Sequence, residues 1–344
     1  MARRIVQVAA FVFAGVFALI VAVPSAQAPA APERRTTPKP AAKWTAPRTP
    51  WGDPDLQGTW NNGTITPLER PRGAGEKELL TRDEEQEINE QSDTRAAVEN
   101  RPRDATQDVE LAYDQVWWDR GRSIGRTSLI VDPKDGRLPP LTPQGEKLMA
   151  ERAAARAGRG AFDSWTDRPL QERCILYHGV PPLPTGYNNN YEITQAPGVV
   201  AIFHEEIHEV RIIPLDGRPH AGSSIQQWMG DSRGHWDGDT LVVETTNFRP
   251  DATFRFPADP ATLRVIERFR RVAPDAIDYQ FTVQNPTFYS SPWTATLPMR
   301  PGEGLIYEYA CHEGNYAIVH VLQGHRAEEK RAEEAAEKEG VTPR

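Results

Sequence analysis

The sequence of 344 residues contains only two cysteines, Cys174 and Cys311. Two thiols exclude a disulfide-rich scaffold, whereas an even pair in an oxidising compartment most simply forms one bond. We predict a Cys174–Cys311 disulfide that closes a loop of about 137 residues and stabilises the fold by on the order of a few kcal/mol. Two buried free thiols are the alternative.

Phosphate-binding motifs are also missing. The chain has no Walker loop and no dinucleotide-binding G-x-G-x-x-G, the glycine-rich turns that bring backbone N–H groups close to a phosphate. We therefore expect no nucleotide and no other cofactor.

Positive charge is in deficit. The 40 Lys and Arg residues are outnumbered by 48 Asp and Glu residues, which gives a formal net charge of −8. Nucleic-acid binding depends on Lys and Arg at the phosphates, so we expect no nucleic-acid partner. The high proline content of 31 residues favours loops and strand edges over long helices.

Long apolar runs are absent except at the N-terminus. Arg3 and Arg4 precede an apolar stretch from Val8 to Val23, and small residues follow it. This pattern predicts a secretory signal peptide over residues 1–30, with an uncleaved membrane anchor as the alternative. Residues 31–50 are rich in proline and predict a linker. The protein should therefore be periplasmic or secreted, and should contact a membrane only through an uncleaved signal segment.

Helices are expected in the N-terminal half, inserted at about residues 81–157. Thr81 and Glu84 have capping-box spacing at the start of a polar helix over residues 81–100. A second helix has Thr142 as its N-cap, Pro143 in its first turn and Gly158 at its end.

From residue 190 onward the hydrophobic period is two, which indicates β-strands. The expected strand segments are VVAIF, IHEVRII, SRGHW, TLVVETTNF, LRVIERFRRV, IDYQFTV, WTATL and LIYEYA. Short turns between them predict an antiparallel meander. The fold class is therefore mainly β, an antiparallel barrel or curled sheet, as one domain over residues 51–325 with a charged tail at 326–344.

The segment FHEEIHEV contains His204 and His208 in the H-E-x-x-H spelling of zinc proteases. That motif needs a helix, which places residues i and i+4 on one face. Here the flanking runs are β-branched and have period two, so both histidines should lie on strands about 13 Å apart. We expect a hairpin or bulge with polar residues at its tip, without a metal.

Polar side chains that suit acid–base chemistry gather in two stretches, residues 206–239 and 307–316. We expect them to converge at one opening of the sheet, beside apolar strand faces, as in small-molecule sites. The candidate proton carriers and catalytic groups are His208, His220, His235, His312 and Glu308. The candidate binding residues are Arg211, Asp216, Arg218, Asp231, Arg233 and Asn189, the arginines holding an anionic group.

Strand alternation places three glutamates on apolar faces. Glu244, Glu267 and Glu308 each share a strand face with apolar neighbours. If those faces point inward, each carboxylate needs a buried donor or a proton, and Arg211, Arg233 and Arg268 are available as partners. The alternative is that each glutamate lies on the solvated face or in a structural salt bridge.

Several stretches, most specifically GDSRGHWDGDTLVVETTNF, resemble a widespread family of secreted bacterial proteins. The resemblance covers most of residues 51–320 and implies a shared fold and site, but no activity. Separately, Gly58-Thr59-Trp60 is similar to the G-x-W at the first strand of lipocalins. This resemblance implies that the expected antiparallel barrel or curled sheet is lipocalin-like.

Three functions remain open. The first is binding of a small, partly apolar molecule, with cofactor-independent turnover as a hydrolase, lyase or isomerase. The second is a carrier or envelope interaction module without turnover. The third is a metal site formed by His208, His220 and His312.

Overall fold

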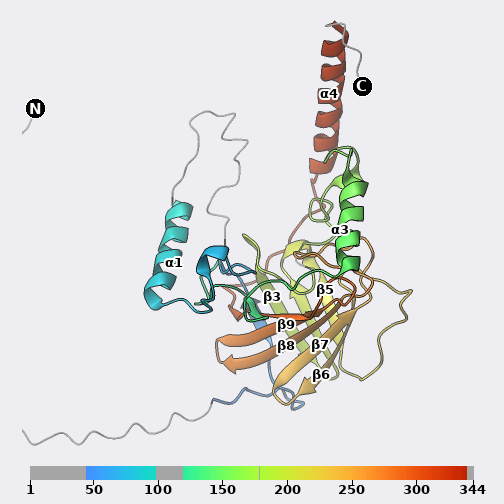
Figure 1. Ribbon diagram of the computed structural model, residues 1–344. Helices are drawn as coiled ribbons and strands as arrows, with labels where there is room; N and C mark the ends of the chain where they lie inside the picture. Colours follow the sequence, from blue (N-terminus) through green and yellow to red (C-terminus); the bar gives the residue numbers. More distant parts are fainter. Residues whose placement is uncertain (1–43, 98–118, 178, 339–344) are drawn as a thin grey trace, which may run out of the picture. The chain divides into compact units, whose positions relative to one another are not determined.

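The computed structural model describes residues 44–97, 119–177 and 179–338 (Figure 1). Trp44–Arg344 form one compact unit. The expected signal peptide and most of the expected linker lie in the separate unit Met1–Lys43, outside the described residues. The last part of the expected linker is described, and there Ala46 and Thr49 are buried. No helix in the described part of the chain has the length and apolar character needed to cross a bilayer.

The described strands form two antiparallel sheets, as the mainly β prediction requires. The five-stranded sheet has, in spatial order, β11 (Arg300–Pro301), β1 (Gly58–Asn61), β3 (Asn190–Ala196), β4 (Val199–His204) and β5 (Val210–Pro214). The six-stranded sheet has β2 (Ile130–Asp132), β10 (Trp293–Thr296), β9 (Ala276–Gln284), β8 (Arg264–Ala273), β7 (Thr240–Thr246) and β6 (Asp231–Asp237). Among these strands β5 and β6 are both edges, so the two ladders do not join there into a closed barrel.

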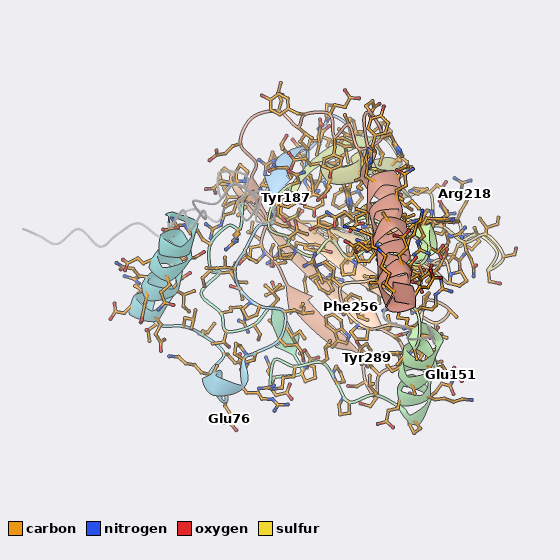
Figure 2. The ribbon with its side chains drawn as sticks, turned by 90° about the horizontal axis from the view of Figure 1, so that it is seen from above. Glu76, Glu151, Tyr187, Arg218, Phe256 and Tyr289 are labelled. Carbon is orange, nitrogen blue, oxygen red and sulfur yellow. A yellow bond between two sulfur atoms is a disulfide. The ribbon has the colours of Figure 1, made fainter. Side chains whose placement is uncertain are left out.

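Alternation builds the core between the sheets. In β9, Ile277, Tyr279, Phe281 and Val283 are fully buried, while the residues between them are partly exposed. The inward-facing residues of β1, β3, β4 and β5 join the same hydrophobic cluster. Figure 2 shows Tyr289 and Phe256 among the packed side chains and Arg218 at the periphery.

Turn chemistry sets the strand connections as predicted. The β6–β7 hairpin closes with Asp237 opposite Thr240, and Gly238 has the positive φ of +61° that this tight turn requires. The β8–β9 hairpin closes with Ala273 opposite Ala276. Both hairpins belong to the six-stranded sheet.

The helices begin where their capping residues predict. In α1 (Arg82–Ala97), the Thr81 backbone N–H donates to the Glu84 carboxylate at 2.7 Å, and Glu84 N–H donates to the Thr81 hydroxyl at 3.3 Å. In α3 (Pro143–Arg156), Thr142 Oγ1 accepts from Gly145 N–H at 3.0 Å. The last helix, α4 (Ala317–Lys338), has no buried residue. Short 3₁₀ turns complete the described helical elements, namely η1 (Arg72–Ala74), η3 (Trp165–Asp167) and η4 (Glu206–His208).

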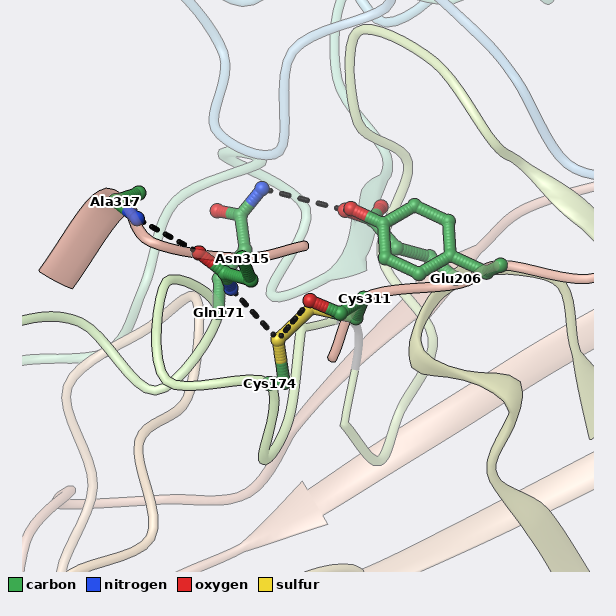
Figure 3. The surroundings of a disulfide bond; sticks show 7 residues. Gln171, Cys174, Glu206, Cys311, Asn315 and Ala317 are labelled. Carbon is green, nitrogen blue, oxygen red and sulfur yellow. Dashed lines mark hydrogen bonds between the residues drawn. A yellow bond between two sulfur atoms is a disulfide. The ribbon is translucent and has the colours of Figure 1, made fainter. Parts of the chain in front are cut away.

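One strand prediction is wrong. The segment LIYEYA, residues 305–310, forms no strand, and Leu305, Tyr307 and Glu308 are exposed. The strand before this segment, β11, has only two residues, and Gly304 then turns the chain with a φ of +74°. The alternating residues that follow therefore do not continue β11. The segment is held instead by the predicted disulfide, since Cys311 is bonded to Cys174 with 5.8 Å between their Cα atoms (Figure 3).

Candidate functional site

The H-E-x-x-H letters do not form a zinc-protease helix. His204 ends β4, and its buried ring contacts Tyr191 edge-on at 4.9 Å between centroids. The chain then turns through η4 into β5, so the letters occupy the tip of a hairpin, as predicted. The side chain of His208 lies outside the described residues.

The tip of this hairpin carries a buried carboxylate. Ile207 has a left-handed φ of +64°, which is rare for a β-branched residue, and Glu206 and Ile207 are both buried. Glu206 accepts hydrogen bonds from Gln171 Nε2 at 3.2 Å and from the Tyr309 hydroxyl at 3.4 Å, next to the disulfide (Figure 3). Burial, followed by the charge of Glu206, raises the pKa of the nearby Tyr177 hydroxyl.

An ion pair crosses the interior between the two sheets. Arg211 of β5 donates to both carboxylate oxygens of Glu267 on β8, one of them at 3.0 Å, and the two side chains are 3% and 0% exposed. Arg211 also donates to Ser232 Oγ and to Thr245 Oγ1, each at 2.9 Å, and the Tyr279 hydroxyl donates to Glu267 at 2.9 Å. Of the three glutamates placed on apolar faces, Glu267 therefore enters the interior, where a structural salt bridge neutralises it.

Ser232 also lies within the letters G-x-S-x-G at Gly230–Gly234. A nucleophile elbow needs a strand, a sharp turn and a helix, whereas these residues run into the extended strand β6. The Ser232 hydroxyl bonds to Arg211 and to Thr245 Oγ1, the latter at 2.9 Å. Neither of these two partners is a general base, so the serine serves the network rather than nucleophilic attack.

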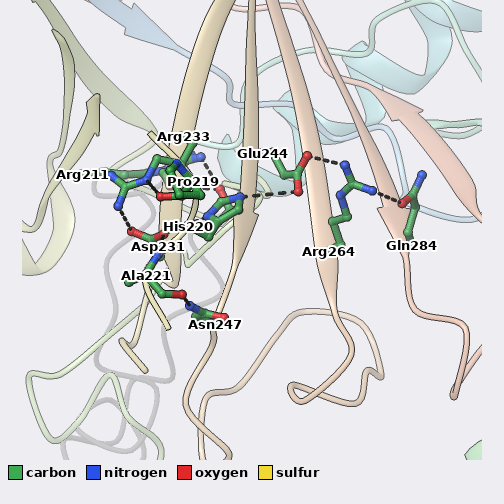
Figure 4. A network of polar contacts seen from close by, with 12 residues as sticks. Arg211, Pro219, His220, Ala221, Asp231, Arg233, Glu244, Asn247, Arg264 and Gln284 are labelled. Atoms are coloured by element: carbon green, nitrogen blue, oxygen red, sulfur yellow. Dashed lines mark hydrogen bonds and ion pairs between the residues drawn. The ribbon is translucent and has the colours of Figure 1, made fainter. Parts of the chain in front are cut away.

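A second polar cluster lies on the outer face of the six-stranded sheet (Figure 4). His220 Nδ1 is 2.8 Å from Asp231 Oδ2, and His220 Nε2 is 3.4 Å from Glu244 Oε1. Arg233 pairs with Asp231 at 3.1 Å, and Arg264 pairs with Glu244. Glu244 is thus on the outer face, because neighbouring positions of β7 alternate between the core and this cluster.

The loop after β5 is fastened to this cluster by its backbone. Ala221 N–H donates to Asp231 at 3.0 Å, the Pro219 carbonyl accepts from Arg233 at 3.2 Å, and the Ala221 carbonyl accepts from Asn247 at 2.8 Å. Asp231 therefore holds the His220 ring and the loop backbone together.

Between the two strand edges lies a cavity of about 530 Å³, which we call the β5–β6 groove. Its lining joins the β5 edge, the β6 edge and the segment that leads into β6. The lining residues are Glu209, Val210, Arg211, Ile212, Pro214, Gln226, Gln227, Trp228, Met229, Gly230, Asp231, Ser232, Arg233 and Arg249. Three predicted binding residues, Arg211, Asp231 and Arg233, thus meet at one cavity.

The groove has an apolar wall and a cationic rim. Val210 and Ile212 are 50% and 55% exposed although they belong to a strand. The guanidinium of Arg249 lies over the ring of Trp228, 4.5 Å from its centroid. At the closed end, a Cβ on Gly234 would lie 2.7 Å from Leu215 and 2.8 Å from Ile213, so the edges touch there.

The other predicted residues do not join the groove. Asp216 and Arg218 form an exposed pair within their own loop, where the Arg218 N–H and side chain lower the pKa of Asp216. His235 is exposed on β6. Asn189 is fully buried and holds backbone groups, donating to the carbonyls of Asp119 and Thr185.

The predicted pair in the C-terminal segment is also separate from the groove. Glu308 and His312 are exposed there, near the disulfide. Of the two alternatives for Glu308, the solvated position holds, because the inward orientation required a strand that does not form.

No family model, no curated protein and no solved structure matches this chain. The groove residues that sequence reasoning missed are chiefly Gln227 and Arg249, whereas Trp228 is one of several tryptophans that the sequence offers either for an apolar pocket or, more simply, for the core. The signal for Gln227 is a pair of amides beside Trp228 just before the Gly230 turn, a pattern equally typical of a core position, and Arg249 has no such signal.

Proposed function

We propose that the protein binds a small, partly apolar molecule with an anionic group in the β5–β6 groove. The observation that carries this proposal is the lining, which combines exposed strand residues Val210 and Ile212 with the guanidiniums of Arg233 and Arg249. Small-molecule sites have this composition and a volume of about 300–1,000 Å³.

The β5 edge adds backbone donors to the groove. His204 N–H bonds to the Glu209 carbonyl and Leu215 N–H to the Gly198 carbonyl. Hydrogen-bonded positions alternate along an antiparallel pair, so the peptide groups of Val210 and Ile212 point away from β4, towards the open edge. These N–H groups can donate to a ligand whose apolar part lies on the neighbouring side chains.

Arg211 positions the residues at the base of the groove and does not offer its charge to the ligand. Its guanidinium is neutralised by Glu267, and it holds Ser232 at the base of the groove. The anionic group of the ligand is therefore assigned to the rim, where the side chains of Arg249 and Arg233 are themselves partly exposed.

The setting that we propose is a carrier of the lipocalin-like kind in the periplasm or outside the cell. Two curled antiparallel sheets around one core support a lipocalin-like carrier. The disulfide supports an oxidising compartment such as the periplasm or the cell exterior. Kinship with the secreted bacterial family is part of the same proposal and depends on the GDSRGHWDGDTLVVETTNF stretch.

Acid–base turnover is the second candidate, and the Asp231–His220 contact of 2.8 Å favours it. A carboxylate at Nδ1 fixes the imidazole orientation, as in general-base dyads. Asp231 lines the groove and contacts His220 directly. The His220 ring is therefore separated from a bound ligand by the Asp231 side chain alone. If turnover occurs, His220→Ala abolishes it and His235→Ala, which alters an exposed histidine, leaves it unchanged.

The binding proposal is tested with anilinonaphthalene sulfonate, an apolar probe with one anionic group, followed by fluorescence titration. The wild type should bind it saturably, and Ile212→Asp should abolish binding because a carboxylate replaces the apolar wall. Leu305→Asp is the matched control, since Leu305 is a more exposed apolar residue outside the groove. Equal loss in both variants, or no saturable binding by the folded wild type, contradicts the proposal.

A further inference from the structure

Three side chains with metal-ligating atoms meet where α4 passes the loop after α3. Asp163, His325 and Glu329 each offer one ligand atom, and these atoms all lie within 4.8 Å of one another. Within the described residues this is the one such group of three, and it includes neither His220 nor His312. We propose that it binds a divalent transition-metal ion, such as Zn²⁺, and thereby fastens α4 to the loop.

Helix geometry supplies two of the ligands. His325 and Glu329 are four residues apart on α4, so they project from the same face of the helix. His325 Nε2 is 3.3 Å from Glu329 Oε1. Bonds of about 2.0–2.2 Å place neighbouring ligand atoms of a tetrahedral site about 3.3–3.6 Å apart, so this pair already has the required separation.

The third ligand comes from the other side of the contact. Asp163 Oδ2 accepts from Gly160 N–H at 2.7 Å, which orients the carboxylate. The loop and the helix are joined independently of any ion, because Arg326 donates to the Phe162 carbonyl at 2.9 Å and the Phe162 ring lies 5.2 Å from that of His325. The Asp163 ligand atom already lies within 4.8 Å of those of His325 and Glu329.

The other nitrogen of His325 faces a third carboxylate. His325 Nδ1 is 3.7 Å from Glu328 Oε2. Histidines that bind metals commonly present their second N–H to a carboxylate, which fixes the tautomer and leaves the opposite nitrogen free for the ion. The Glu328 carboxylate is slightly too far for a hydrogen bond in this structure, but it lies beside Nδ1, while Nε2 is the nitrogen 3.3 Å from Glu329, so we assign Nε2 as the ligating atom.

The donor set indicates the class of ion. One imidazole with two carboxylates suits Zn²⁺ and its neighbours better than Ca²⁺ or Mg²⁺, which prefer oxygen ligands alone. Three protein ligands leave a position for water. Arg326 pairs with Glu329 at 3.1 Å, and Arg159 interacts electrostatically with Asp163. Because these two arginines compete with the metal ion for the carboxylates, we expect micromolar rather than nanomolar affinity.

The test is calorimetric titration of the full chain with zinc chloride after treatment with a chelator. We expect His325→Ala and Asp163→Asn to lose the site that the wild type shows, and Glu328→Gln to weaken it about tenfold. His320→Ala is the matched control, because His320 is an exposed histidine on the same helix and outside the cluster.

Cobalt provides a second readout. Co²⁺ in the wild type should give visible absorption bands that His325→Ala lacks and His320→Ala retains, while far-UV circular dichroism verifies that each variant is folded. Absence of binding by the wild type, or equal binding by His325→Ala, overturns the proposal. The groove plays no part in this measurement, so failure here leaves the binding proposal unaffected.

Discussion

Arg211 on β5 and Glu267 on β8 form a doubly hydrogen-bonded ion pair across the interior, and it links the two sheets. Each oxygen of Glu267 has a donor, and Tyr279 adds a third contact. The hydrogen-bonding capacity of the Glu267 carboxylate is therefore taken up within the protein, and we assign the pair a structural role. Its consequence for function is indirect, because it fixes the β5 edge relative to Ser232 on β6 and so shapes the base of the groove.

Replacing Arg211 with Met should lower the free energy of unfolding by about 3–5 kcal/mol, because Glu267 is left buried without its counter-charge. Urea denaturation followed by fluorescence measures the loss. Arg264→Met is the control, since its partner Glu244 is partly exposed, and it should cost less than about 1 kcal/mol. Similar losses in the two variants would show that the interior pair has no special role.

Removing both cysteines, as Cys174→Ser with Cys311→Ser, should lower stability by about 2–5 kcal/mol because the loop of 137 residues is no longer closed. The same variant should show faster amide exchange around Tyr309, which the disulfide holds against Glu206. A reducing agent should destabilise the wild type but not the variant. Identical unfolding curves for the two proteins would contradict the expectation.

Gly234→Ala should widen the groove at its closed end. The added methyl group would meet Leu215 and Ile213 within 2.8 Å, and relieving the overlap requires the β5 and β6 edges to separate. The expected cost is about 1–3 kcal/mol, with weaker probe binding. Gly222→Ala, whose methyl group has no neighbour closer than 4.0 Å, should change stability by less than about 0.5 kcal/mol. Unaltered probe affinity in Gly234→Ala would argue that the edges do not set the groove.

The capping box of α1 should make that helix sensitive to acid. Contacts of Glu84 with the Lys77 side chain and the Thr81 backbone lower its pKa from 4.5 to about 2. The folded form therefore binds this proton less readily, so the stabilisation is complete above pH 4.5 and is lost as the pH falls towards 2. NMR shifts of α1 should follow this change in the wild type and not in Glu84→Gln. Glu87→Gln, one turn later, should behave like the wild type.

Local patterns predicted the elements well because local physics determines them. The alternation from Ile277 to Val283 gave a strand with the correct buried face, and Thr81 and Thr142 gave correct helix starts. The segment at 305–310 has the same alternation but no strand. Whether an alternating segment becomes a strand depends on a free sheet edge, which sequence periodicity does not reveal.

The candidate site was predictable only in part. Sequence clustering brought His220, Asp231 and Arg233 together because they lie on one loop and the strand that it covers. It could not distinguish the inner and outer faces of β5 and β6, so Arg211 was expected beside them, whereas its guanidinium pairs with Glu267 in the interior. Trp228 and Arg249 join the groove through tertiary packing, for which the sequence has no periodic signal.

The most direct test of the central claim is NMR mapping of bound anilinonaphthalene sulfonate on isotope-labelled protein. The account predicts saturable shifts of the Val210 and Ile212 backbone amides and of the Trp228 indole, with little change at the Leu305 amide. Saturable shifts confined to residues 305–321, with the Val210 and Ile212 amides unmoved, would contradict it.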